Sequence, residues 1–174
     1  MHWRGALLGP ALVGLALLGC NPSAASVETT REAVGKILDD WHAAAAMANE
    51  ERYFSLLTPD AVFLGTDAKE RWNKEAFRAY AHPHFERGKA WRFRSTRRAI
   101  SVDTSGTVAW FDEDLATDTL GPARGSGVLT LDRKSGAWHI AQYNLAITVP
   151  NAQFPAVMQL LTQPMETPVP FQPH

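Results

Sequence analysis

The chain has 174 residues, with 17 lysines and arginines against 18 aspartates and glutamates, and one cysteine. This length suits a single domain with one hydrophobic core, and the balanced charge argues against a nucleic-acid surface, which needs a concentrated positive field. A single cysteine excludes an internal disulfide. The densest basic cluster is typical of a solvated strand face and comprises Arg92, Arg94, Arg97 and Arg98.

The N-terminus has the layout of an exported precursor. Residues 5–19 carry no charge and follow a short basic start, and this run is too short to cross a hydrocarbon core of about 30 Å as a settled helix. The sequence Leu17-Leu18-Gly19-Cys20 resembles the lipobox of bacterial lipoproteins. The resemblance implies cleavage after Gly19 and acylation of Cys20, which would anchor the protein to a membrane. The alternative is an ordinary secretory signal with a chance cysteine.

The same resemblance implies a location. In many Gram-negative lipoproteins an aspartate after the acylated cysteine marks retention in the inner membrane, and this chain has Asn21 there. We therefore expect attachment to the cell envelope, at the periplasmic face of the outer membrane if the host is Gram-negative.

Three helices are predicted before the main sheet. Thr29-Thr30-Arg31-Glu32 forms a capping box for the first helix, whose apolar residues recur at helical spacing over positions 34–48. A second short helix is expected at about 50–57. A buried strand is expected at 61–64, and Asn73 then caps a third helix that ends near His82-Pro83-His84.

An antiparallel meander is predicted to follow, with strands at about 91–102, 107–117, 124–132 and 137–149. In the first of these strands Trp91 and Phe93 have the opposite parity to Ile100 and Val102, which predicts a β-bulge between the pairs. Helices followed by a sheet that they cover on one face define an α+β domain. The expected organisation is a leader at 1–19, a tether at 20–28, the domain at 29–151 and a C-terminal extension at 152–174.

The order of elements and several local sequences resemble the SnoaL-like branch of the nuclear transport factor 2-like superfamily. The similar segments are 40–42, 62–67, 70–72, 109–113 and 138–145. The resemblance implies a cone-shaped, curved antiparallel β-sheet wrapped around N-terminal helices and open at one end to a pocket. The superfamily contains isomerases, dehydratases and polyketide cyclases as well as non-catalytic modules, so the fold does not decide the activity. No motif here matches the acid-base residues of the cyclases.

Candidate catalytic residues are Asp112, Glu113 and His42. Alternation along the strand at 107–117 turns either Asp112 or Glu113 toward the pocket, and parity leaves the choice open. A carboxylate beside aromatic rings has a raised pKa and can act as a general acid or base, whereas the alternative is a salt bridge to an arginine such as Arg124 or Arg71. His42 flanks the apolar stripe of the first helix, where it either transfers protons or is a satisfied histidine at the edge of the core.

Candidate ligand-binding residues come from the last strand and from the loop after the buried strand. Gln142 and Asn144 share the parity of Trp138, which requires burial, so both amides are expected on the concave face. Asp67 and Trp72 are expected at the pocket mouth, although Asp67 also fits an Asx turn. The complete expected set is Asp67, Trp72, Trp110, Arg124, Gln142 and Asn144.

Neither a metal nor a cofactor is expected. His82 and His84 lack a third ligand, and Gly125-Ser126-Gly127 lies inside a strand, where glycines allow a bend rather than cradle a phosphate. The sequence favours an envelope lipoprotein that binds a small organic molecule in a conical pocket and contacts the membrane through Cys20. The alternatives are a proton-transfer enzyme of the isomerase, dehydratase or hydrolase type, and an assembly module that forms homodimers.

Overall fold

The computed structural model describes residues 24–163, so Cys20 and the expected cleavage site lie outside the described residues. The helices are α1 (Ala24–Ala46), α2 (Glu50–Ser55), α3 (Lys74–Glu86), the 3-10 helix η1 (Asn151–Gln153) and α4 (Phe154–Thr162). The strands are β1 (Leu57–Leu64), β2 (Arg71–Asn73), β3 (Phe93–Val102), β4 (Val108–Thr117), β5 (Ala123–Asp132) and β6 (Ala137–Ile147).

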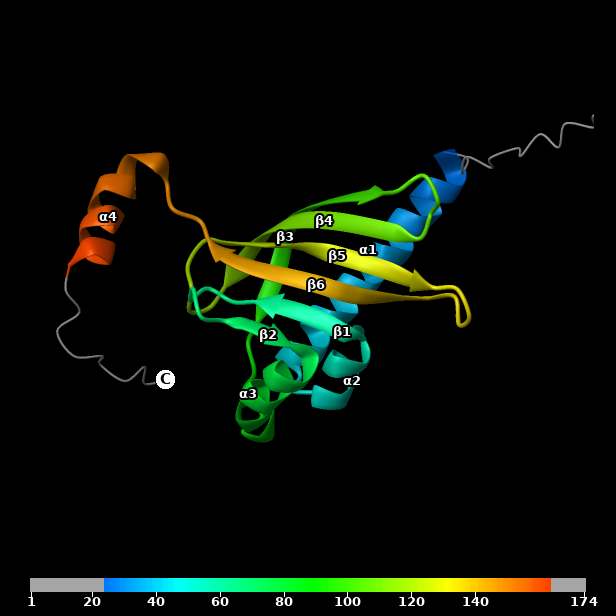
Figure 1. Ribbon diagram of the computed structural model, residues 1–174, viewed down its shortest axis with the longest axis horizontal. Helices are drawn as coiled ribbons and strands as arrows, with labels where there is room; N and C mark the ends of the chain where they lie inside the picture. Colours follow the sequence, from blue (N-terminus) through cyan, green and yellow to red (C-terminus); the bar gives the residue numbers. More distant parts are fainter. Residues whose placement is uncertain (1–23, 164–174) are drawn as a thin grey trace, which may run out of the picture.

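The strands form one curved six-stranded sheet in the order β2-β1-β6-β5-β4-β3. The predicted antiparallel meander forms β3 to β6, while β1 joins β6 in parallel and β2 pairs antiparallel with β1 at the edge. Helices α1, α2 and α3 lie against one face of the sheet (Figure 1). The predicted α+β class, with a curved sheet around N-terminal helices, is confirmed. The parallel pair makes the sheet mixed, and the short strand β2 replaces part of an expected loop.

The predicted bulge in β3 is present. The register with β4 shifts between Ser95 and Arg97, so Thr96 is the additional residue. Because one additional residue reverses the parity of all that follow, Arg98 turns toward α1. There its guanidinium Nη1 donates to the backbone carbonyl of Gly35 at 3.2 Å.

A second bulge lies in β6. Gln142 pairs with Val128 and Ile140 pairs with Leu129, which leaves Ala141 without a partner in β5. Strand β6 therefore buries Trp138 and Ile140 before the bulge and Tyr143 and Leu145 after it. The expected inward orientation of Gln142 and Asn144 is wrong, because strict alternation does not hold across a bulge, and both side chains lie on the outer face of the sheet.

Aromatic rings fill the space between the helices and the sheet. Trp41 of α1 lies 4.7 Å from Tyr53 of α2 and 4.6 Å from Tyr143 of β6 between ring centroids. Phe63 of β1 stacks on Phe77 of α3 at 3.9 Å. Since offset and tilted ring pairs at these distances add to the free energy of burial, these contacts hold the helices inside the curved sheet.

The helix boundaries differ from the sequence expectation at two points. Helix α1 begins at Ala24, so residues 24–28 are helical rather than tether, and the expected capping box at 29–32 lies within the helix. Helix α3 continues through Pro83 to Glu86. Pro83 is exposed, so the carbonyl that its missing N–H leaves unpaired can bond to water.

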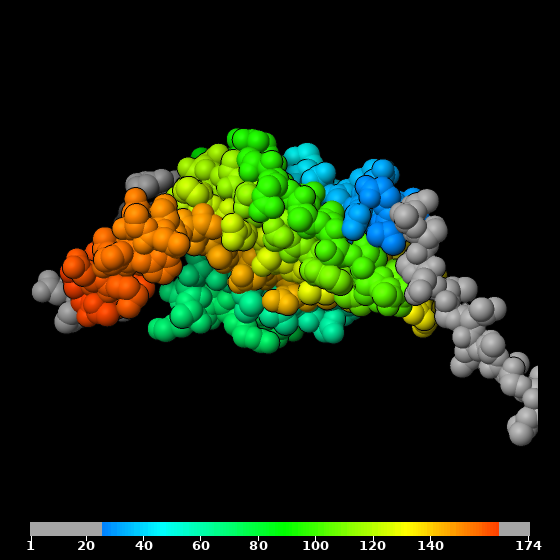
Figure 2. Space-filling model, turned by 90° about the horizontal axis from the view of Figure 1, so that it is seen from above, coloured from blue at the N-terminus to red at the C-terminus, as the bar shows by residue number. Residues whose placement is uncertain are grey.

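The C-terminal apolar segment forms α4, which projects away from the sheet (Figures 1 and 2). Its Phe154, Met158, Leu160 and Leu161 are exposed. None of the helices between residues 24 and 163 combines the length and hydrophobicity that a membrane span requires.

The bulge in β6 depends on Gly127 of the neighbouring strand. A Cβ atom at Gly127 would clash with the backbone carbonyl of Gln142 and lie 3.0 Å from the ring of Phe111. Because a backbone carbonyl in a paired strand has little freedom to move, we expect Gly127→Ala to lower the free energy of unfolding by about 2 kcal/mol or more. Urea denaturation measures this loss. Ser126→Ala is the matched control with an expected change within about 0.5 kcal/mol, and equal effects of the two variants would contradict the prediction.

Candidate functional site

Glu113 is the buried carboxylate at the centre of the candidate site. Alternation along β4 turns Phe111, Glu113 and Leu115 toward the helices, and Glu113 is 0% exposed. An isolated ionised carboxylate in such surroundings is very unfavourable, so it requires charged and hydrogen-bonded partners. The structure thus resolves the choice that strand parity left open: Glu113, not Asp112, faces the interior.

Three side chains from three different elements bind this carboxylate. The Nε2 atom of His42 on α1 lies 2.7 Å from Glu113 Oε1, and the Nε of Arg98 on β3 donates to Oε2 at 2.8 Å. The hydroxyl of Tyr143 on β6 donates to Oε1 at 3.3 Å. Arg98 also reaches Asp39 of α1, with Nη1 2.8 Å from Oδ1. The cluster therefore connects the long helix to both bulged strands.

Gly125 provides the space in which these groups meet. It pairs with Glu113 across the β4–β5 ladder. A Cβ atom there would clash with the hydroxyl of Tyr143 and lie 3.0 Å from Glu113 Oε1. Sequence reasoning expected the glycines of β5 to allow a bend, whereas the structure shows that Gly125 allows close approach of two polar side chains.

The partners decide the ionisation of the cluster. Burial alone would raise the pKa of Glu113, but the hydrogen bond from His42, its charge when the imidazole is protonated, and the charge and hydrogen bond of Arg98 outweigh burial and lower that pKa. Burial, followed by the nearby charge of Glu113, raises the pKa of the Tyr143 hydroxyl well above its ordinary value. Near neutral pH, Glu113 is therefore ionised and Tyr143 is protonated.

This ionisation fixes the orientation of the His42 proton. An ionised carboxylate only accepts hydrogen bonds, so the Nε2 atom of His42 carries a proton and donates it to Glu113. In the neutral imidazole the other nitrogen, Nδ1, is then an unprotonated acceptor. Nδ1 is buried and has no hydrogen-bond partner among the described residues. A carboxylate that holds one imidazole nitrogen and leaves the other free is the arrangement of an oriented general base.

The surroundings of His42 are mostly aromatic. Its ring lies 5.4 Å from the Trp41 ring and 6.3 Å from both Phe93 and Tyr143. Four further buried polar atoms lack a partner within the described part of the chain: Trp41 Nε1, Tyr53 Oη, Thr58 Oγ1 and Arg98 Nη2. Since buried polar atoms in native structures almost always have partners, the unpaired Nδ1 of His42 is available to a ligand or an ordered water.

The other expected site residues of β4 and β5 lie on the outer face. Asp112 is 3.3 Å from Arg97, and Arg124 is 3.5 Å from Asp114, so neither reaches the Glu113 cluster. Trp110 is 49% exposed on the same outer face. The expected placement of Trp110 and Arg124 at the pocket is therefore wrong, because Phe111 of β4 and Ala123 of β5 are the buried neighbours. Of the two carboxylates that parity left open, Asp112 is the one that faces outward.

The loop residues have structural roles in the described chain. The Oδ1 atom of Asp67 accepts a hydrogen bond from the backbone N–H of Lys69 at 2.8 Å, which is the Asx turn weighed as the alternative. Trp72 lies at the edge of the sheet, with its ring 4.7 Å from Tyr80 and 5.7 Å from Phe77. Neither residue joins the cluster around Glu113.

Sequence reasoning missed Arg98 and Tyr143. The basic cluster pattern predicts a solvated strand face for Arg98, and strict alternation places Tyr143 opposite the concave side. The sequence does contain a signal for Arg98, since the predicted bulge in β3 reverses the parity of the residues that follow the bulge.

His82 contacts Glu50 at 2.7 Å. Between residues 24 and 163 no three histidine, cysteine, aspartate or glutamate side chains gather as metal ligands.

Comparison with known proteins assigns the family. Residues 34–150 match the model of the SnoaL-like domain. The chain belongs to the SnoaL-like domain family. A search of curated protein sequences found no match.

Solved structures share the fold of this SnoaL-like domain. A candidate scytalone dehydratase from Novosphingobium aromaticivorans is 12% identical with a TM-score of 0.60, over 73% of this chain and 89% of that one. A protein of unknown function from Mycobacterium tuberculosis is 19% identical with a TM-score of 0.59, over 72% and 76%. An NTF2-like protein of unknown function from Pseudomonas putida is 12% identical with a TM-score of 0.58, over 74% and 91%. At these identities the likeness establishes the fold alone.

The buried cluster predicts a distinct dependence of stability on pH. Removing one partner of a buried ion pair leaves a charge unpaired, so Glu113→Gln is expected to lower the free energy of unfolding at pH 7 by about 3–5 kcal/mol. The lowered pKa of Glu113 stabilises the fold above the unfolded-state value of 4.5, and this stabilisation is lost as the pH falls through the folded-state pKa. The difference between wild type and variant should therefore shrink below pH 4.5.

Denaturant titrations at several pH values measure this difference. Asp112→Asn is the matched control, since the adjacent Asp112 forms an exposed ion pair that contributes at most about 1 kcal/mol. A Glu113→Gln loss that stays constant from pH 7 to acid, or that equals the Asp112→Asn loss, would contradict the assignment.

Proposed function

We propose that this SnoaL-like domain binds a small organic molecule beside His42 and transfers a proton on it. The observation that supports the proposal is the free Nδ1 atom of His42, which is buried while Nε2 is held by the ionised Glu113. A structural histidine in a core normally satisfies both nitrogens. An unpaired nitrogen with a fixed tautomer is instead suited to take a proton from a bound molecule.

Each member of the cluster has a defined part in this proposal. His42 takes the proton at Nδ1 and returns it to a second position, so that it acts first as general base and then as general acid. Glu113 orients the ring and stabilises the imidazolium that forms. Arg98 keeps Glu113 ionised, and Tyr143 donates to the same carboxylate. These roles fit removal of a proton next to a carbonyl, as in isomerisation or dehydration.

Access to His42 is proposed to occur past two half-buried rings. Phe93 lies 6.3 Å from the His42 ring, and Trp91 lies 5.6 Å from Tyr53. Both rings pack against the core while reaching the surface. A planar ligand that displaces Phe93 would lie beside the His42 ring.

Solvent deuterium exchange tests the proton transfer without knowledge of the natural substrate. The protein is incubated in D₂O with ketones that have acidic C–H bonds, 2-tetralone among them, and NMR follows exchange and binding. We expect wild type to accelerate exchange and His42→Gln to lower the rate by about 10²-fold or more, the usual contribution of a general base. Gln can still donate an N–H to Glu113, so the fold should be kept.

His139→Gln is the matched control, because His139 lies on β6 outside the buried cluster. An undiminished rate in His42→Gln would refute the catalytic role. Saturable binding without exchange would refute proton transfer and leave a carrier, and the lack of both across the panel would contradict the proposal as a whole.

We also propose that Cys20 is acylated and attaches the domain to the cell envelope, at the periplasmic face of the outer membrane in a Gram-negative host. The proposal is supported by the uncharged run at 5–19 and the Leu17-Leu18-Gly19-Cys20 sequence. Two or more acyl chains give stable membrane attachment. In the native host, Cys20→Ser is expected to abolish incorporation of labelled palmitate and to leave the leader uncleaved, which the larger mass of the variant shows. Labelling that persists in the variant would contradict acylation at this position.

A further inference from the structure

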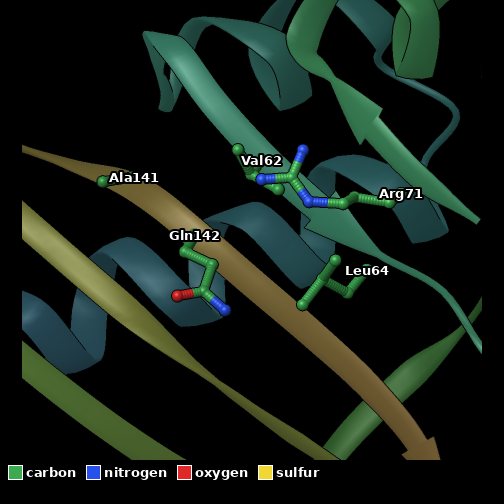
Figure 3. A pocket seen from close by; sticks show the side chains of 5 residues that line it. All are labelled: Val62, Leu64, Arg71, Ala141 and Gln142. Atoms are coloured by element: carbon green, nitrogen blue, oxygen red, sulfur yellow. The ribbon is translucent and has the colours of Figure 1, made fainter.

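A shallow hollow of about 240 Å³ opens on the outer face of the sheet. In Figure 3 its lining side chains lie in front of the strands and α1 lies behind them, so the hollow is on the opposite side of the sheet from the His42 cluster. The lining residues are Val62 and Leu64 of β1, Arg71 of β2, and Ala141 and Gln142 of β6.

The hollow forms where two strand irregularities meet. Leu57 pairs with Ile140 and Val62 pairs with Gln142, so residues 58–61 separate these pairs in β1 whereas Ala141 alone separates them in β6. The parallel ladder is interrupted at this point, and the surface between β1 and β6 is depressed. On the other side of β6, the missing side chain of Gly127 leaves room for the backbone carbonyl of Gln142. The hollow is thus built into the backbone and does not depend on the position of one side chain.

Two polar groups flank an apolar floor in this hollow. Arg71 pairs with Leu64, and Gln142 pairs with Val62 on the other side of β1. In Figure 3 the Arg71 guanidinium lies over β1 near Val62, and the Gln142 amide points away from it on the other side of β6. Among the described residues, neither side chain forms a hydrogen bond or an ion pair. Since no acidic residue lines the hollow, its positive charge is uncompensated.

Arg71 differs in this respect from Arg97 and Arg124, two arginines of the outer face that are paired with carboxylates. Arg97 contacts Asp114 at 2.7 Å and Arg124 contacts the same carboxylate at 3.5 Å. A guanidinium with all its side-chain donors free is suited to a carboxylate, which accepts two parallel hydrogen bonds from arginine.

We propose that this hollow binds a small organic carboxylate with a short branched apolar group. The carboxylate oxygens accept hydrogen bonds from Arg71, and the apolar group covers Val62, Leu64 and Ala141. The hollow is smaller than the roughly 300–1,000 Å³ of pockets for drug-sized ligands, so it fits a molecule with only a few carbon atoms. This site shares no residue with the His42 cluster, and it does not depend on the proposed proton transfer.

NMR titration of the isotope-labelled protein tests this site, with isovalerate as the probe. We expect saturable shifts of the Gln142 side-chain amide and of the Val62 and Leu64 methyl groups. Isovaleramide, the neutral analogue of the same shape, should bind at least about tenfold more weakly than isovalerate, because it lacks the charge that pairs with arginine. Inorganic phosphate, a second anion without an apolar group, should shift the Gln142 amide only weakly and leave the methyl groups unchanged.

Arg71→Met should weaken isovalerate binding about tenfold or more, since it removes the charge and keeps an apolar stem. Arg94→Met is the matched control, because Arg94 is an exposed arginine of β3, and His42→Gln should leave isovalerate binding unchanged. Equal binding of isovalerate and isovaleramide, or equal binding by wild type and Arg71→Met, would overturn the proposal. If phosphate binds as tightly as isovalerate, the hollow is a plain anion site and the proposal is overturned. If no ligand shifts the Gln142, Val62 or Leu64 signals, both a carboxylate site and an anion site are excluded.

Discussion

The burial of an ionised carboxylate inside an aromatic core is the constraint on which the rest of this structure depends. Glu113 is kept ionised by His42 and Arg98, which come from the long helix and from the edge strand β3. A buried ion pair is seldom more stabilising than apolar side chains of the same volume. Its presence in a core that is otherwise built of rings is therefore better explained by chemistry than by stability, which supports the proton-transfer role proposed for His42.

Two bulges and two glycines assemble both sites. The extra residue in β3 turns Arg98 inward, and the extra residue in β6 turns Tyr143 inward, so both reach the same carboxylate. The bulge in β6 also turns Gln142 outward and opens the hollow beside Arg71. A single local irregularity in β6 thus supplies one hydrogen bond to the interior cluster and one wall of the outer site.

Much of the fold could be predicted from the sequence, because apolar periodicity identifies the main helix and the four meander strands. The bulge in β3 was also predictable, since Phe93 and Ile100 are apolar residues of opposite parity. The same test applies to β6, where Ile140 and Tyr143 conflict in parity, and it would have placed Gln142 outside. Asp112 and Glu113 could not be separated in this way, because their neighbours Trp110 and Phe111 are both aromatic and either could have been buried.

The packing of the interior limits where a molecule could enter to reach His42 and what shape it could have. Because aromatic rings fill the interior, an entering ligand must replace the ring contacts that it displaces. A flat ring replaces them with less loss of dispersion energy than a flexible chain. Phe93 is the first residue of β3, which is the edge strand of the sheet and precedes the bulge at Thr96. An edge strand has a neighbour on one side only, so displacing its first residue breaks fewer backbone hydrogen bonds than an opening elsewhere in the sheet. The proposed entry at Phe93 and the proposed planar ligand are therefore both consistent with this packing.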